Sequence, residues 1–253
     1  MGDDPGRESK GESFMELILE QITKNFGTKQ VLKGASYTFA KEGIYGLLGR
    51  NGAGKTTLFN CLSAEYPPDS GKVELVDHSG TRRPLGQGDV GYVLSTPVVP
   101  EFLTGYEFVK FFLEITGDPG RTGRTPDDWL ALVGIEADDR HRLMRGYSHG
   151  MKNKVQMLCF LIGRPPVILL DEPLTSFDPV AALEMKNLLR DMKEEHILIF
   201  STHILQLATD LCDEIVVLNH GLLEEVDSAL IHTPEFEQRV VELLRDEGEG
   251  EHE

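Results

Sequence analysis

The stretch "GRNGAGKT", residues 49–56, decides the fold that this sequence predicts. An apolar run, "IYGLL" (44–48), precedes it, and a helical pattern, "TLFNCLSA" (57–64), follows it. The stretch matches the spacing G-x-x-x-x-G-K-[ST], whose glycines let backbone N–H groups surround phosphate oxygens at a helix start. A glycine-rich turn without a ligand is the alternative, but it would not need a strand before it and a helix after it. The sequence therefore predicts a phosphate-binding loop.

The residues of this loop are expected to bind ATP and Mg²⁺. Lys55 would reach the β- and γ-phosphates, and the hydroxyl of Thr56 would bind the metal ion. Thr57 is expected to support the phosphates from the next position. The predicted ATP-binding residues are Gly49, Arg50, Asn51, Gly52, Ala53, Gly54, Lys55, Thr56 and Thr57.

A second motif, "VILLDEP" (167–173), is a buried strand that ends in two carboxylates. Asp171 is expected at the Mg²⁺ site, because a strand tip next to a phosphate loop places a carboxylate near the metal shell. Glu172 would orient and deprotonate the attacking water, so it is a predicted catalytic residue. Two acids at a strand end can also be a simple polar exit from a sheet. The phosphate loop upstream favours catalysis.

The remaining pattern indicates an α/β protein. Alternating segments at 15–22 and 31–39 predict an antiparallel opening, joined by a turn. Later apolar runs, "HILIFS" (196–201) and "EIVVLN" (214–219), are typical of strands buried on both faces of a parallel sheet. A helical pattern at 179–195 separates two of the buried strands.

The chain is predicted to have three parts. Residues 1–13 form an acidic tail, and residues 14–233 form one ATPase domain with an inserted helical subdomain at about 97–163. Residues 234–253 contain an amphipathic helix and the acidic end "DEGEGEHE". A solvated acidic end is the simplest interpretation of that composition.

Composition excludes several functions. The chain has 25 Lys+Arg and 42 Asp+Glu residues and a net charge of −17, which argues against binding nucleic acid. Cys61, Cys159 and Cys212 are far apart and set in apolar surroundings, so we expect reduced core residues and neither a disulfide nor a cysteine metal site. Apolar runs are shorter than the roughly 18 to 20 residues that cross a bilayer. Any membrane role is therefore expected to come from a partner.

With these motifs in order, the sequence resembles the nucleotide-binding subunit of the ABC transporter family from about residue 15 to the late helix. The resemblance implies an α/β fold with a P-loop NTPase (RecA-like) core, an N-terminal antiparallel β subdomain and the helical insertion. Phe26 in "KNFGTKQ" matches the adenine-stacking aromatic, although packing in the core is an alternative. His203 in "STHIL" matches the switch histidine that touches the γ-phosphate, which makes it a third predicted catalytic residue with Lys55 and Glu172.

The stretch "GYSHGMKNK" (146–154) falls at the family's signature sequence. In the family, two ATPase domains pack head to tail, and this helix start faces the phosphate that the partner holds. Ser148, His149 and Gly150 are therefore expected to act in trans, although Ser148 also has the properties of an ordinary helix N-cap. Asp178 matches the D-loop, and it also precedes Pro179 as a capping residue would.

Two positions depart from the family pattern. His149 stands where the first signature glycine is expected, and Met151 replaces a glutamine. Ser95 stands at the Q-loop position, where the family has a glutamine that senses Mg²⁺ and the attacking water. Serine is too short to reach the same place without a bridging water. We expect slow hydrolysis or altered coupling from this replacement.

The predicted function is that of an ATPase subunit that dimerises around ATP and Mg²⁺ and drives a separate transmembrane permease. The pair is a homodimer or an ATPase heterodimer, and the subunit is expected in the cytoplasm on the inner face of the membrane. Its layout is most similar to the ATPases of bacterial exporters of peptides or drugs. An importer subunit is one alternative, and a soluble ABC-type protein of ribosomes or DNA, or a slow nucleotide switch, is another.

Overall fold

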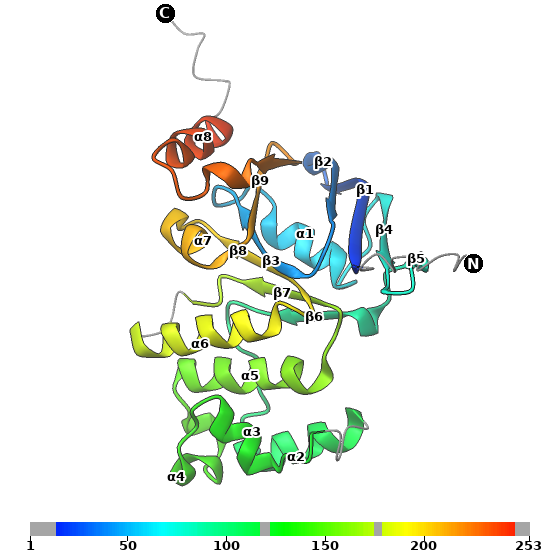
Figure 1. The fold of residues 1–253 in the computed structure, drawn as a ribbon. Coiled ribbons are helices and arrows are strands. Elements are labelled where there is room, and N and C mark those ends of the chain that lie inside the picture. Colours follow the sequence, from blue (N-terminus) through cyan, green and yellow to red (C-terminus); the bar gives the residue numbers. More distant parts are fainter. Residues whose placement is uncertain (1–13, 117–121, 175–178, 246–253) are drawn as a thin grey trace, which may run out of the picture.

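A computed structural model describes residues 14–116, 122–174 and 179–245 as two sheets with helices packed around them (Figure 1). Strands β2, β1, β4 and β5 form one sheet, and β10, β9, β3, β8, β7 and β6 form the other, in those orders. The strands are β1 Glu16–Phe26, β2 Lys29–Phe39, β3 Gly43–Leu48, β4 Ser70–Val76, β5 Arg82–Pro84, β6 Val90–Val93, β7 Val167–Asp171, β8 Ile197–Thr202, β9 Glu214–Asn219 and β10 Leu222–Val226.

The helices follow the strands in an alternating order that confirms the predicted α/β class. They are α1 Lys55–Leu62, α2 Gly105–Thr116, α3 Pro126–Leu132, α4 Ala137–Arg140, α5 His149–Gly163, α6 Pro179–Met192, α7 Leu205–Leu211 and α8 Glu235–Leu244, with short 3₁₀ turns at Gln87–Asp89, Met144–Gly146 and Ser228–Leu230.

The larger sheet is parallel apart from its edge strand β10, which pairs antiparallel with β9. Every residue of β3, β7 and β8 is buried, which is why these strands are continuously apolar in the sequence. One hydrophobic core joins α1 to β3 and to the antiparallel sheet, and a second core packs α5 to α8 on the other face. The predicted parallel core is confirmed.

The smaller sheet confirms the predicted antiparallel opening and covers α1 (Figure 1). Its central strand β1 has a bulge at Gln21, whose φ of 52° is unusual for a residue other than glycine. Gly71 on β4 lies so close that a Cβ there would be 2.4 Å from the Gln21 carbonyl oxygen. Ser36 on β2 accepts hydrogen bonds from the backbone and side-chain nitrogens of Gln21 at 2.9 and 3.0 Å. Glycine and serine neighbours therefore accommodate the bulge.

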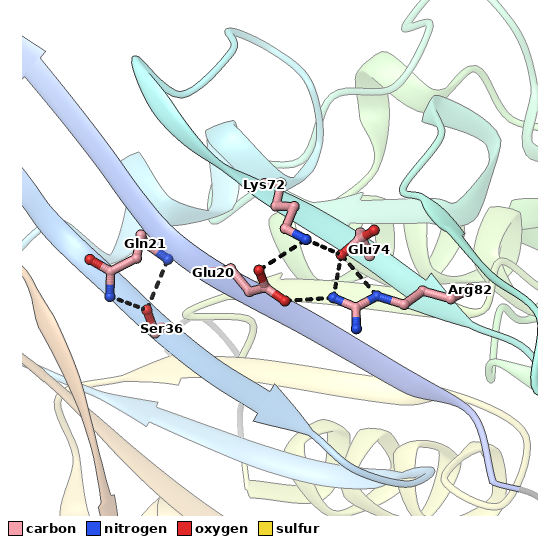
Figure 2. A network of polar contacts seen from close by, with 6 residues as sticks. All are labelled: Glu20, Gln21, Ser36, Lys72, Glu74 and Arg82. Carbon is pink, nitrogen blue, oxygen red and sulfur yellow. Dashed lines mark hydrogen bonds and ion pairs between the residues drawn. The ribbon is translucent and has the colours of Figure 1, made fainter.

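Four charged side chains cross-link the outer surface of this sheet (Figure 2). Lys72 lies 3.0 Å from Glu20 and 3.1 Å from Glu74, and Arg82 pairs with both carboxylates as well. The pKa of Glu20 is lowered chiefly by its bond to Lys72, and that of Glu74 by its bond to Arg82. The network lies at the surface of the sheet, where such ion pairs contribute little stability.

Helices α2 to α5 lie between β6 and β7 in the chain, below the parallel sheet as drawn in Figure 1. They share their own hydrophobic cluster, which includes Trp129 of α3 and Leu158 of α5. Thr125 caps α3 by accepting a bond from the Asp128 N–H, while Asp128 bonds back to the Thr125 N–H. These helices fall within the range 97–163 that the sequence assigns to a helical insertion, after strand β6.

Two further expectations concern burial and membrane spans. Cys61 and Cys212 are buried and unpaired, but the expectation of a core position is wrong for Cys159, which is only half-buried on α5.

In the described ranges, every helix is too short or too polar to cross a bilayer. The predicted tails at 1–13 and 246–253 and the D-loop residue Asp178 lie outside the described residues.

Candidate nucleotide site

A cavity of about 640 Å³ lies at the carboxyl ends of the parallel strands, between the phosphate loop and the β1–β2 hairpin. Its volume is in the usual range for small-molecule sites. The residues that line it come from five separate segments of the chain. They are Phe26, Lys29, Val31, Arg50, Asn51, Gly52, Gly54, Lys55, Thr56, Thr57, Ser95, Asp171, Glu172 and His203.

The phosphate loop begins α1 with a glycine in the left-handed region. Gly54 has φ 109°, and a Cβ there would lie 2.8 Å from Cγ1 of Val31. Its carbonyl accepts the first helical bond, from the Leu58 N–H at 2.8 Å. No side chain caps this helix start among the described residues, so the N–H groups of its first turn face the cavity as an anion site requires.

Lys55 is buried at this helix start, although lysine is rarely buried without a partner. Its Nζ donates a hydrogen bond of 2.7 Å to the Gly49 carbonyl. Burial lowers the pKa of Lys55, while the carboxylates of Glu172 and Asp171 act in the opposite direction. The ammonium group is thus held at the cavity wall, facing the acidic strand end.

Three hydroxyl groups hold the carboxylate of Asp171. Its Oδ2 accepts from Thr56 at 3.0 Å and from Tyr92 at 3.4 Å, and its Oδ1 accepts from Ser201 at 2.5 Å. Burial, and then the charge of Asp171, raise the pKa of Tyr92, so this phenol stays protonated and donates. Tyr92 and Ser201 were not predicted as site residues. Ser201 reaches the site because it pairs with Asp171 across β7 and β8, a register that the sequence does not show.

Glu172 turns away from the sheet with a left-handed backbone, at φ 50°. Its N–H donates to both the carbonyl and the hydroxyl oxygen of Ser201, each at 3.2 Å. Its Oε1 lies 2.7 Å from Nδ1 of His203. A left-handed conformation is costly for glutamate, and strain of this kind is often found at functional sites. The turn points the Glu172 carboxylate into the cavity instead of along the strand.

The aromatic and Q-loop positions also reach this cavity. Phe26 is 49% exposed and lines it, so the alternative of a core residue is excluded. Its ring meets Tyr66 edge-on, with centroids 5.8 Å apart. Ser95 lines the cavity as well. Gly49 and Ala53 are not among its described lining residues but line adjacent hollows.

The signature residues lie elsewhere. Ser148 caps α5 by accepting a bond of 3.2 Å from the Met151 N–H, as the capping interpretation predicts. His149 is exposed and its Nδ1 lies 3.3 Å from the Asn153 amide nitrogen. Ser148, His149 and Gly150 are not among the described residues that line the cavity. A single copy of the chain does not bring the signature to the phosphate loop.

The sequence profile of the family described as "ABC transporter" matches residues 32–175, more than half of the 253 residues. The chain belongs to the ABC transporter family. It is an ATP-binding subunit of that family and an ATPase, since its relatives are ATP-binding transporter proteins.

Three relatives illustrate the similarity. The chain is 30% identical to an uncharacterized ABC transporter ATP-binding protein, YxlF, of Bacillus subtilis, over 81% of this chain and 68% of the relative. It is 31% identical to the bacitracin transport ATP-binding protein BcrA of Enterococcus faecalis, over 87% and 72%. The sulfate/thiosulfate import ATP-binding protein CysA of Nephroselmis olivacea is 30% identical, over 85% of this chain and 63% of the relative.

Solved structures share the fold. One described as the ATP binding subunit of an ABC transporter has a TM-score of 0.75 and 24% identity, and covers 90% of this chain and 98% of its own. Another, cbiO1 from Clostridium perfringens, part of the complex cbiONQ, has a TM-score of 0.68 and 24% identity, and covers 89% and 92%. The predicted P-loop NTPase core is therefore confirmed.

Proposed function

We propose that the cavity binds ATP with its phosphates on the start of α1 and its adenine against Phe26. The observation that carries this is the convergence of Lys55, Thr56, Asp171 and Glu172 on one cavity. Lys55 would leave the Gly49 carbonyl to bind the β- and γ-phosphates, which are stronger acceptors. The half-exposed ring of Phe26 offers a flat apolar surface at the far side of the loop.

The residues present also fit Mg²⁺. The Thr56 hydroxyl and the Asp171 carboxylate are hard oxygen donors within 3.0 Å of each other. Further ligands of the ion would come from phosphate oxygens and water, which Mg²⁺ commonly retains. Bound there, the ion would neutralise charge on the phosphates.

Hydrolysis needs a base near the γ-phosphate, and Glu172 is the proposed base. The left-handed turn directs its carboxylate into the cavity, where it can hold and deprotonate a water. His203 contacts that carboxylate and lines the same cavity, so it is placed to bind the γ-phosphate oxygens and to orient Glu172. Lys55, Glu172 and His203 are thus the proposed catalytic residues.

The active unit is proposed to contain two ATPase domains, in the simplest case two copies of this chain. Ser148, His149 and Gly150 form an exposed helix start that the cavity of the same chain does not use. Ser148 caps only the Met151 N–H, and the other N–H groups of such a helix start can bind an anion, so it suits the γ-phosphate held by a second copy. Asp178 is proposed to lie in that interface. Residues 14–233 would form the ATPase domain, with 97–163 as its helical subdomain.

The subunit is proposed to sit on the inner face of the cell membrane and to drive a separate permease that exports peptide or drug-like molecules. The similarity to the bacitracin transport protein supports export, since it extends over 87% of this chain. The similarity to the sulfate/thiosulfate import protein favours import as the second candidate. Transport assays in inverted vesicles from cells that express the chain with its permease would distinguish export from import. ATP-dependent accumulation of labelled bacitracin supports export of peptides, and release contradicts it.

Calorimetric titration of ATP tests the site itself. The native chain should bind ATP more tightly with Mg²⁺ than with a chelator, and Thr56→Ala should abolish that difference while retaining binding. Ser63→Ala, at the other end of α1, is the matched control. Equal Mg²⁺ dependence in the native chain and Thr56→Ala would refute the proposed metal site.

A further inference from the structure

A second, smaller groove of about 250 Å³ adjoins the nucleotide cavity. Four of its lining residues, Lys29, Lys33, Arg50 and His220, carry basic side chains. Among the described residues that line it, none carries a carboxylate. In a chain with a net charge of −17, this grouping of basic side chains favours an acidic occupant.

The groove is continuous with the proposed ATP site. Lys29, Val31 and Arg50 line both the groove and the larger cavity, together with the loop residues Asn51 and Gly52. An anion in the groove would therefore lie beside the phosphate loop. Like charges repel, so such an anion and the phosphates of ATP would disfavour each other.

The last turn of α8, close to the end of the described residues, is bonded to a residue that lines this groove. The side-chain amide of Asn219 donates a hydrogen bond of 2.5 Å to the Leu243 carbonyl, and Asn219 itself lines the groove. Leu244 lines another hollow that also contains Arg50. The last turn of α8, in red in Figure 1, is thus tied to the end of β9 next to the phosphate loop.

The sequence that follows Arg245 is "DEGEGEHE", residues 246–253, in which five of eight residues are Asp or Glu. Eight residues reach at most about 26–29 Å when extended, at about 3.3–3.6 Å each, which is ample for a groove whose rim contacts α8. The two glycines permit the bends that such a path needs. The length of the segment 246–253, the place where it leaves α8 and its negative charge are therefore all compatible with docking in the groove.

We propose that the acidic segment 246–253 docks in the basic groove of its own chain and competes with nucleotide for the phosphate loop. Tethering keeps the local concentration of the segment high, so weak ion pairs suffice for docking. Docking does not depend on the proposed ATP site, whereas competition rests on it. The segment would act as a built-in inhibitor that nucleotide displaces.

Zero-length carbodiimide cross-linking tests docking in the nucleotide-free full-length chain. We expect amide bonds from the segment to Lys29 or Lys33 in the monomer fraction, identified by mass spectrometry. The ion pair of Lys72 and Glu20, 3.0 Å apart, is the internal control for the reaction. Formation of the control cross-link without any bond to Lys29 or Lys33 would overturn docking. Bonds found only between two chains would overturn it as well, because the occupant would be a second copy.

Competition is tested by ATP affinity in low salt. The variant with Asp246→Asn, Glu247→Gln, Glu249→Gln, Glu251→Gln and Glu253→Gln should bind ATP about three- to tenfold more tightly than the native chain. The difference should vanish in about 0.5 M salt, which screens ion pairs. A control with the same charge change uses exposed acids elsewhere: Glu114→Gln, Glu136→Gln, Asp138→Asn, Asp191→Asn and Glu194→Gln.

The control variant separates a local effect from net charge. Equal affinity of the tail variant and the native chain, or an equal gain in the control variant, would overturn competition. A native chain that binds no ATP at all would instead contradict the proposed nucleotide site, so the two failures are distinguishable.

Discussion

The Oε1 atom of Glu172 lies 2.7 Å from Nδ1 of His203, across the ends of the neighbouring strands β7 and β8. The contact exists because Glu172 leaves its strand with φ 50° and because Ser201 accepts its N–H. Both side chains line the cavity that the phosphate loop closes from the other side. The ends of neighbouring parallel strands therefore bring the proposed base, the histidine and the phosphate loop to one cavity.

Glu172→Gln should abolish most ATP hydrolysis while keeping ATP binding. The amide has nearly the same size but cannot accept a proton, and removing a general base costs about 10²- to 10⁴-fold in rate. Turnover and ATP affinity should be measured together, with Glu224→Gln on the exposed face of β10 as control. Turnover within tenfold of the native chain would exclude Glu172 as the base.

Ser201→Ala should lower both stability and turnover. The fully buried hydroxyl bonds Asp171 and accepts the N–H of Glu172, so its removal leaves two polar groups poorly paired. The free energy of unfolding should fall by about 1–3 kcal/mol. Denaturant melts and turnover assays should use Ser63→Ala as control, since its hydroxyl makes a long bond of 3.4 Å to the Asn60 carbonyl. Unchanged stability and turnover in Ser201→Ala would show that Ser201 positions neither acid.

Ser95→Gln should raise turnover several-fold. Ser95 lines the cavity, but its side chain is too short to reach a metal or water that a glutamine would contact directly. Thr96→Gln is the matched control, because Thr96 is exposed and does not appear among the described lining residues. Equal ATPase rates for Ser95→Gln and the native chain would count against slow hydrolysis as a consequence of Ser95.

Stability should fall as the pH falls below about 6.5, the ordinary pKa of histidine. His196 is buried, its Nδ1 donates to the Pro165 carbonyl at 2.7 Å, and burial lowers its pKa. Because the pKa of His196 is lower in the folded chain, the unfolded chain binds a proton there at a higher pH than the folded chain does. The buried neutral His196 therefore contributes its full share to the stability above the pKa that it has in the unfolded chain. That share is lost as the pH falls toward the lower pKa of His196 in the folded chain.

His196→Gln should reduce this acid sensitivity. Thermal melts between pH 7.5 and 5.5 should show a smaller loss of stability in His196→Gln than in the native chain, and the exposed His232→Gln should behave like the native chain. Identical pH profiles for all three would assign the acid sensitivity to other groups.

The sequence predicted the elements whose patterns are local. The loop around Lys55, the buried run before Asp171 and the alternating β1 and β2 each follow from a short spacing, and the structure confirms those strands and helices. Tyr92 and Ser201 were missed because their roles arise from register between strands that are far apart in the sequence. The left-handed turn at Glu172 was missed as well, since glutamate rarely adopts it and Pro173, the next residue, marks a break in the strand without indicating a positive φ before it.

The groove beside the phosphate loop could not be predicted either. Its basic residues come from the β1–β2 hairpin, the loop after β3 and the β9–β10 turn, and only the tertiary fold brings them together. The anchoring of Leu243 by Asn219 is also a tertiary contact. Composition alone indicated that the acidic end is solvated.

The central claim is that two copies complete each catalytic site, and mixing two inactive variants tests it most directly. Lys55→Met removes the phosphate contact, and Ser148→Arg blocks the signature helix start. Each variant alone should be nearly inactive. A mixed dimer keeps one intact site of two, so an equal mixture should recover up to about a quarter of native turnover. Failure of the mixture to exceed the separate variants, while both still bind one another, would contradict sharing of the site between chains.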